Sequence, residues 1–92
     1  MIARRVVVEG RVQGVGYRFA AVDAARDARV TGWVRNRRDG TVEAFAQGDT
    51  AAVDAFVAWC RRGPPASRVT GVVVDEATPD ASLTAFDQRA TL

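Results

Sequence analysis

The sequence predicts a single α+β domain in which two helices cover one face of an antiparallel sheet. Short valine-rich runs alternate with two segments whose apolar residues recur at helical spacing. An Asp-Gly pair separates two of the strand-like runs, which is a strong signal for a tight hairpin. The length of 92 residues suits one hydrophobic core. We therefore treat residues 1–92 as one domain.

The chain is predicted to begin with a strand and a helix. Residues 4–11 (RRVVVEGR) are rich in β-branched side chains, which favour a strand. Residues 17 to about 30 are predicted to form a helix that ends before Gly32, a residue type that commonly stops helices. The apolar face of this helix is predicted to contain Tyr17, Ala20, Ala21, Ala24 and Ala28.

A hairpin and a second helix follow. Residues 33–38 and 41–47 flank the turn Asp39-Gly40, since glycine tolerates the positive φ of a tight turn. Asp49-Thr50 is predicted to cap a helix that continues to about Arg62, and residues 63–65 (GPP) end it. Its buried stripe is predicted to be Val53, Phe56, Val57 and Cys60.

Two further strands complete the order. Residues 67–77 (SRVTGVVVDEA) are predicted to form one, and residues 83–90 (LTAFDQRA) a shorter additional one. Strand, helix, strand, strand, helix, strand is the split βαβ, ferredoxin-like arrangement. The predicted fold is therefore a βαββαβ sandwich, with or without a short fifth strand.

The composition narrows the chemistry. All thirteen basic residues are arginine and the net charge is +2, which permits nucleic-acid binding without requiring it. With no histidine and only Cys60, histidine catalysis, a structural zinc site and an internal disulfide are excluded. No apolar run approaches the length of a signal peptide core or a membrane span. We therefore expect a cytoplasmic protein without membrane partners.

The turn before the first helix lacks the usual features of a helix start. Residues 10–18 (GRVQGVGYR) offer no Ser, Thr, Asp or Asn cap and place Arg18 at the positive end of the helix dipole. Gly14 and Gly16 allow the backbone to turn several N–H groups inward, and such nests bind anions. Arg18 would clamp the same anion. The alternative is an ordinary glycine-containing turn with Arg18 in solvent.

Asn36 is unusual in a hairpin strand, because its amide competes with the backbone ladder. An amide donates and accepts hydrogen bonds at once, which suits holding a water molecule. The alternative is that Asn36 only begins the turn.

The same hairpin is strongly basic. We call Trp33, Arg35, Arg37 and Arg38 the basic hairpin. Such a surface can contact a nucleic-acid backbone. The alternative is a solvated face whose charge Glu43 and Glu9 offset from neighbouring strands.

No general base is evident. The chain has no histidine, no carboxylate pair is placed in an obvious pocket, and Cys60 and Trp59 fall where packing explains them. Chemistry at the glycine loop would therefore use an arginine, backbone amides and an amide side chain. Those groups suit a reaction whose substrate supplies a good leaving group or its own proton acceptor.

The two motifs together resemble those of the acylphosphatases. GRVQGVGYR resembles the family pattern Gly-x-Val-Gln-Gly-Val-x-Phe-Arg, with Tyr17 in place of the common phenylalanine. GWVRNRRDGTVEAFAQG, residues 32–48, resembles the second family motif, and GPP follows the second helix. The resemblance covers nearly the whole chain in the right order.

The resemblance implies hydrolysis of acyl phosphates to carboxylate and inorganic phosphate, without cofactor or metal. It implies that Arg18 binds the phosphoryl group, that Asn36 orients the attacking water and that the substrate's phosphate accepts the proton. The implied phosphate-binding loop is Val12, Gln13, Gly14, Val15, Gly16, Tyr17 and Arg18.

Two other interpretations of the function are possible. Nucleic-acid-binding modules share the ferredoxin-like layout, but the aromatic-rich motif of RNA recognition domains is missing. Similar domains also occur inside larger carbamoyl-transfer proteins. Because the chain ends at Leu92 without zinc-finger or transferase sequence, we expect a stand-alone, monomeric enzyme with a small-molecule substrate and no nucleic-acid partner.

Overall fold

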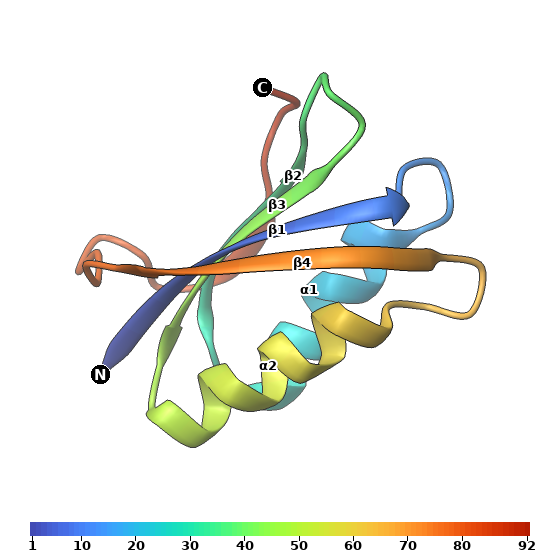
Figure 1. The fold of residues 1–92 in the computed structure, drawn as a ribbon. Helices are drawn as coiled ribbons and strands as arrows, with labels where there is room; N and C mark the ends of the chain where they lie inside the picture. Colours follow the sequence, from blue (N-terminus) through green and yellow to red (C-terminus); the bar gives the residue numbers. More distant parts are fainter.

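A computed structural model describes all 92 residues and confirms the ferredoxin-like α+β fold, with both helices on one face of the sheet (Figure 1). The opposite face of the sheet carries no helix. In chain order the elements are β1 (Ile2–Arg11), α1 (Tyr17–Ala28), β2 (Thr31–Asn36), β3 (Val42–Gly48), α2 (Thr50–Arg62), β4 (Arg68–Ala77) and β5 (Phe86–Gln88).

The sheet has five strands in the order β4-β1-β3-β2-β5. β1 pairs antiparallel with β3 and β4, and β2 pairs antiparallel with β3. The fifth strand is present but pairs parallel with β2, so the sheet is mixed and the prediction of a purely antiparallel sheet is wrong at this edge. The reason is topological. β4 runs opposite to β2, and the chain reverses once between β4 and β5, so β5 runs in the direction of β2.

The buried face of α1 differs from the predicted one. Tyr17 and Ala21 are buried as predicted, but Val22 and Ala25 are buried in place of Ala20 and Ala24. Those two alanines are partly exposed and line a groove between α1 and α2. Because alanines occupy so much of the helix surface, their spacing alone does not decide which side meets the sheet. In α2 the predicted stripe is confirmed for Val53, Phe56 and Cys60, and Val57 is partly buried.

The helix boundaries show two further differences. α1 stops because Arg29 adopts a left-handed conformation with φ of 63°. Gly32 is instead a strand residue, where an added Cβ would lie 1.8 Å from the carbonyl oxygen of Phe45. Asp49 occupies the N-cap position of α2, but its side chain makes no capping hydrogen bond. Gly63, with φ of 67°, ends α2 as predicted.

The core lies between the sheet and the helices, with Tyr17, Phe56 and Phe86 as its largest buried apolar side chains. Cys60 is a buried free cysteine, and burial raises the pKa of its thiol to about 12. Trp59 packs against Tyr17 and Phe56 at ring-centroid distances of 5.3 and 6.4 Å, which confirms its packing role. Neither helix is long and apolar enough to cross a membrane.

Candidate phosphate-binding site

The glycine loop and Asn36 lie at the same end of the sheet. β1 and β2 both run antiparallel to β3, so their C-terminal ends lie at the same end of the sheet. Val8 of β1 and Asn36 of β2 both pair with Val42, which puts them on one rung of the ladder. The loop, residues 12–16, leaves β1 just beyond this rung and enters α1 (Figure 1).

Two glycines give the loop its shape. Gly14 and Gly16 have φ values of 72° and 79°, a left-handed conformation that favours glycine. No atom lies within 4 Å of a Cβ added at either position. The backbone conformation, and not a lack of space, therefore requires glycine here.

The backbone N–H groups of the loop are free. None of those from Val12 to Gly16 donates a hydrogen bond to another group of the protein. The first helical bond of α1 runs from the Ala20 N–H to the Gly16 carbonyl, so the first-turn amides lack intrahelical acceptors. No side chain caps α1, and its first turn holds no acidic residue. The uncapped helix start predicted from the sequence is thus present, with several donors available to an anion.

Arg18 has no carboxylate partner. It is partly buried and forms neither an ion pair nor a side-chain hydrogen bond with the rest of the chain. It lines a cavity of about 100 Å³ at the loop, which we call the loop cavity. The lining residues are Val12, Gly14, Gly16, Tyr17, Arg18, Phe19 and Gln88.

Gln13 and Val15 belong to the predicted loop but do not line the loop cavity. The Gln13 side-chain amide donates to the carbonyl oxygens of Arg37 and Thr41 at 2.7 and 2.9 Å. It therefore ties the loop to the turn that directly follows Asn36. Val15 is partly buried and packs against the core.

Asn36 ends β2 on the face that the helices cover, two residues after the core residue Val34. Its Oδ1 is buried and accepts no hydrogen bond from the protein. Nearly all buried polar atoms are hydrogen-bonded, so an unpaired one calls for an explanation. Asn36 itself does not line the loop cavity.

Tyr17 anchors the start of α1. Its hydroxyl donates to the carbonyl oxygen of Cys60 at 2.7 Å and so joins the two helices. Burial, together with its proximity to Cys60, raises the pKa of Tyr17 well above its usual value. Its phenol therefore stays protonated at physiological pH and contributes packing, not proton transfer.

Charges on the basic hairpin are partly compensated within the chain. Glu43 is 2% exposed and accepts hydrogen bonds from Arg5 and from Arg35, the latter at 2.7 Å. Burial tends to raise the pKa of Glu43, but the two arginine hydrogen bonds outweigh burial and lower it. Arg37 lies 3.9 Å from the same carboxylate. The predicted offset by Glu43 is confirmed, whereas Glu9 forms no ion pair.

The indole of Trp33 is also engaged inside the chain. Arg35 and Arg89 lie 4.5 and 5.0 Å from its ring centre, and Phe45 stacks on it at 6.1 Å. This packing leaves little of the ring for a nucleic-acid base. No group of three or more histidine, cysteine, aspartate or glutamate side chains in the chain is placed to hold a metal ion.

The fold and site together define a small ferredoxin-like α+β protein with a loop of free backbone N–H groups at the uncapped start of its first helix. The acylphosphatase family profile matches residues 4–88. The chain is 52% identical over 88 residues to an acylphosphatase of Anaeromyxobacter dehalogenans, covering 96% of this chain and 95% of that protein. It is 54% identical over 81 residues to an acylphosphatase of Methylococcus capsulatus, covering 88% of each.

The crystal structure of acylphosphatase from Bacillus subtilis superposes with a TM-score of 0.92 at 38% identity, covering 97% of this chain and 99% of that one. This chain therefore belongs to the acylphosphatase family and is an enzyme of that class. The resemblance stated from the two motifs is confirmed.

Sequence reasoning missed Phe19 and Gln88, which both line the loop cavity. Phe19 directly follows Arg18 and is a large apolar side chain outside the predicted buried face of the helix. Those two facts could have indicated from the sequence that Phe19 belongs to the site. Gln88 reaches the cavity because β5 pairs parallel with β2, and the sequence carries no signal for that pairing.

Proposed function

We propose that this protein hydrolyses acyl phosphates, the mixed anhydrides of carboxylic and phosphoric acids, to a carboxylate and inorganic phosphate. The observation that carries the proposal is the donor-rich, uncapped start of α1 beside an unpaired Arg18, in a chain of the acylphosphatase family. The substrate's phosphoryl group would complete the helix start as an anionic cap.

Arg18 and the loop amides bind the phosphoryl oxygens in this proposal. Phosphoryl transfer spreads negative charge over three equatorial oxygens in the transition state, so fixed donors around them lower the barrier. The guanidinium of Arg18 adds a bidentate, permanently charged clamp. Gln13 positions the loop through the hairpin, and Val12, Val15 and Tyr17 support it from the core.

Asn36 orients the attacking water in this proposal. Its buried Oδ1 has no donor within the protein, so it is free to accept a hydrogen bond from the water. The side chain of Gln13 donates a hydrogen bond from the phosphate loop to the carbonyl oxygen of Arg37, which directly follows Asn36. The water site and the phosphate site therefore form one rigid unit. Such positioning accounts for much of the rate in phosphoryl transfer.

The substrate supplies the proton acceptor. No carboxylate, histidine or cysteine lines the loop cavity, and burial raises the pKa of Tyr17 well above its usual value. The water oxygen forms a bond to phosphorus, the bond from phosphorus to the acyl oxygen breaks, and the water's proton passes to a phosphoryl oxygen. The carboxylate leaves with its electron pair, and we expect the reaction to proceed without cofactor or metal.

We further propose that residues 1–92 act as one domain and as a monomer in the cytoplasm. The large exposed apolar side chains are few, and two of them are the chain ends Met1 and Leu92. A single buried free cysteine suits a reducing compartment. The ion pairs of Arg35 and Arg37 with Glu43 speak against nucleic acid as a partner.

Release of phosphate from acetyl phosphate and benzoyl phosphate, measured with EDTA present, tests the proposal. The wild-type protein should hydrolyse both, and Arg18→Gln should lose most of the activity. Arg61→Gln is the matched control, because Arg61 is exposed in the last turn of α2. No hydrolysis above the blank, or equal activity in Arg18→Gln, would contradict the proposal.

A further inference from the structure

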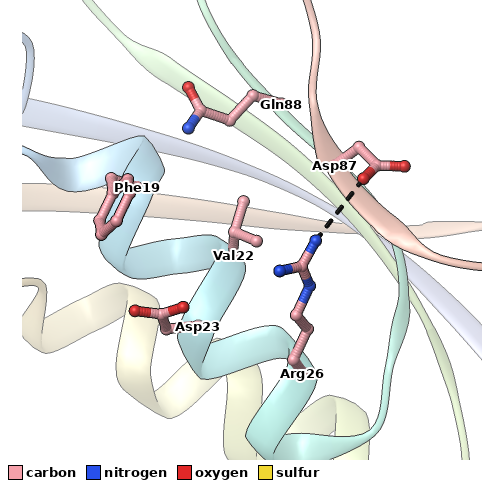
Figure 2. A pocket seen from close by; sticks show the side chains of 6 residues that line it. All are labelled: Phe19, Val22, Asp23, Arg26, Asp87 and Gln88. Atoms are coloured by element: carbon pink, nitrogen blue, oxygen red, sulfur yellow. Dashed lines mark ion pairs between the residues drawn. The ribbon is translucent and has the colours of Figure 1, made fainter.

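We propose that a second cavity binds the acyl part of the substrate and favours neutral, apolar acyl groups of about the size of benzoyl. The inference rests on the proposed hydrolysis of acyl phosphates. This cavity, which we call the acyl groove, has a volume of about 380 Å³. It is lined by Phe19, Val22, Asp23, Arg26, Asp87 and Gln88 (Figure 2).

The acyl groove adjoins the loop cavity. Phe19 and Gln88 line both. The structure has three other cavities, and none of them shares a lining residue with the loop cavity. At about 100 Å³ the loop cavity has room for little beyond a phosphoryl group. The acyl part of a bound substrate must therefore lie outside the loop cavity, and the acyl groove is the hollow that adjoins it.

An apolar surface from α1 forms one wall of the acyl groove. Phe19 is 70% exposed, and Val22 lies one turn further along the same side of the helix. Figure 2 shows both side chains projecting from α1, with Gln88 across from them on β5. Packing within the protein does not account for such an exposed phenylalanine next to Arg18. An aromatic acyl group stacked on its ring would account for it.

The charges of the acyl groove favour a neutral ligand. Arg26 lies 3.8 Å from Asp87 and donates to the carbonyl oxygen of Phe86 at 3.4 Å (Figure 2). Asp23 has no ion-pair partner. Two carboxylates against one guanidinium leave the groove with a net negative charge. An acyl group that carries its own carboxylate would be repelled.

The first test compares kcat/KM for benzoyl phosphate and acetyl phosphate in the wild type and in Phe19→Ala. The acetyl group is too short to cover the phenylalanine ring, so the ratio of benzoyl to acetyl activity should fall about tenfold in the variant. Val73→Ala is the control, because Val73 is exposed on β4 and lines none of the cavities; its ratio should stay within about twofold of wild type. An unchanged ratio in Phe19→Ala would overturn the proposal.

The second test addresses charge. The wild type should prefer benzoyl phosphate to 4-carboxybenzoyl phosphate, and Asp23→Asn should narrow that preference severalfold. A wild-type preference for the carboxylated substrate, or no narrowing in Asp23→Asn, would overturn the neutral-ligand part of the proposal.

The two proposals fail in different ways. If neither benzoyl phosphate nor acetyl phosphate is hydrolysed, the proposed function is wrong. If both are hydrolysed but Phe19→Ala and Asp23→Asn leave the substrate ratios unchanged, the function stands and the acyl groove is not the acyl site.

Discussion

Asn36 is one side chain on which the proposed mechanism depends. The pattern of the hairpin already made an asparagine there unusual, and the fold adds a buried Oδ1 without a protein donor. An amide that is unpaired in the free protein is suited to hold a water. Its role can therefore be separated from stability and from phosphate binding.

We expect Asn36→Ala to lower kcat by about 10²–10³-fold, as loss of one preorganised polar contact typically does. The inhibition constant of inorganic phosphate should stay within about twofold of wild type, because Arg18 and the loop amides remain. Circular dichroism should show an unchanged fold. Turnover near the wild-type rate would exclude the proposed role of Asn36.

No protein base lines the loop cavity, and a second prediction about individual residues follows from this. Burial raises the pKa of Tyr17, and no carboxylate, histidine or cysteine lines the loop cavity, so no enzyme group there should titrate between about pH 6 and 8. The profile of kcat/KM should therefore show no limb in this range that belongs to the enzyme. A limb that moves when one aspartate or glutamate is replaced would reveal a general base.

At the scale of elements, Glu43 links three strands. It sits on β3 and accepts hydrogen bonds from Arg5 on β1 and Arg35 on β2. The arginine hydrogen bonds lower the pKa of Glu43 despite its burial, so the folded state binds its proton less readily than the unfolded state does. The contribution of Glu43 to stability is therefore present above its unfolded pKa, near pH 4.5, and is lost as the pH falls through its lower folded pKa.

Glu43→Gln should accordingly lower the free energy of unfolding by about 2 kcal/mol at pH 7 and by progressively less below about pH 4. Hydrogen bonds from Thr41 lower the pKa of Asp39, and hydrogen bonds from Ser82 lower the pKa of Asp80. The wild type and Glu43→Gln will therefore both lose stability in acid. The measurement is thus the difference between the wild type and Glu43→Gln in urea titrations from pH 3 to 7. A difference independent of pH would contradict the assignment.

Most elements were predictable because local chemistry determines them. The Asp-Gly turn, the glycine loop and the Gly-Pro-Pro stop each restrict the backbone within a few residues. Two features of the fold were not predictable in this way. Gly32 resembles a helix stop, but close approach of β3 is what requires glycine there. The parallel pairing of β5 depends on where the chain returns after β4, and no local pattern encodes that.

The candidate site was predictable to a similar extent. An uncapped helix start with an arginine in its first turn shows in the sequence, and the structure places Arg18 at the loop cavity. The acyl groove could not be predicted from the sequence, because it forms between α1 and β5, and the sequence does not indicate that β5 pairs with β2.

At the scale of the whole molecule, the central claim is that an anion completes the start of α1. A ligand that binds only the native state raises its stability by mass action, by about 2.7 kcal/mol at a hundredfold excess over its dissociation constant. Inorganic phosphate, the proposed product, should therefore raise the melting temperature of this protein in a saturable way. Chloride at matched ionic strength should not, because it cannot bridge several amides and a guanidinium at once.

The most direct measurement is the melting temperature of the wild type, Arg18→Gln and Arg18→Lys over a phosphate titration. The wild type should gain stability with phosphate, Arg18→Gln should lose that protection, and Arg18→Lys should recover part of it, since an ammonium lacks the planar fork of a guanidinium. Without phosphate, Arg18→Gln should be slightly more stable than wild type, by about 0.3–1 kcal/mol, because a cation leaves the positive end of the helix dipole. Equal protection of Arg18→Gln and the wild type would show that the anion does not bind at the start of α1.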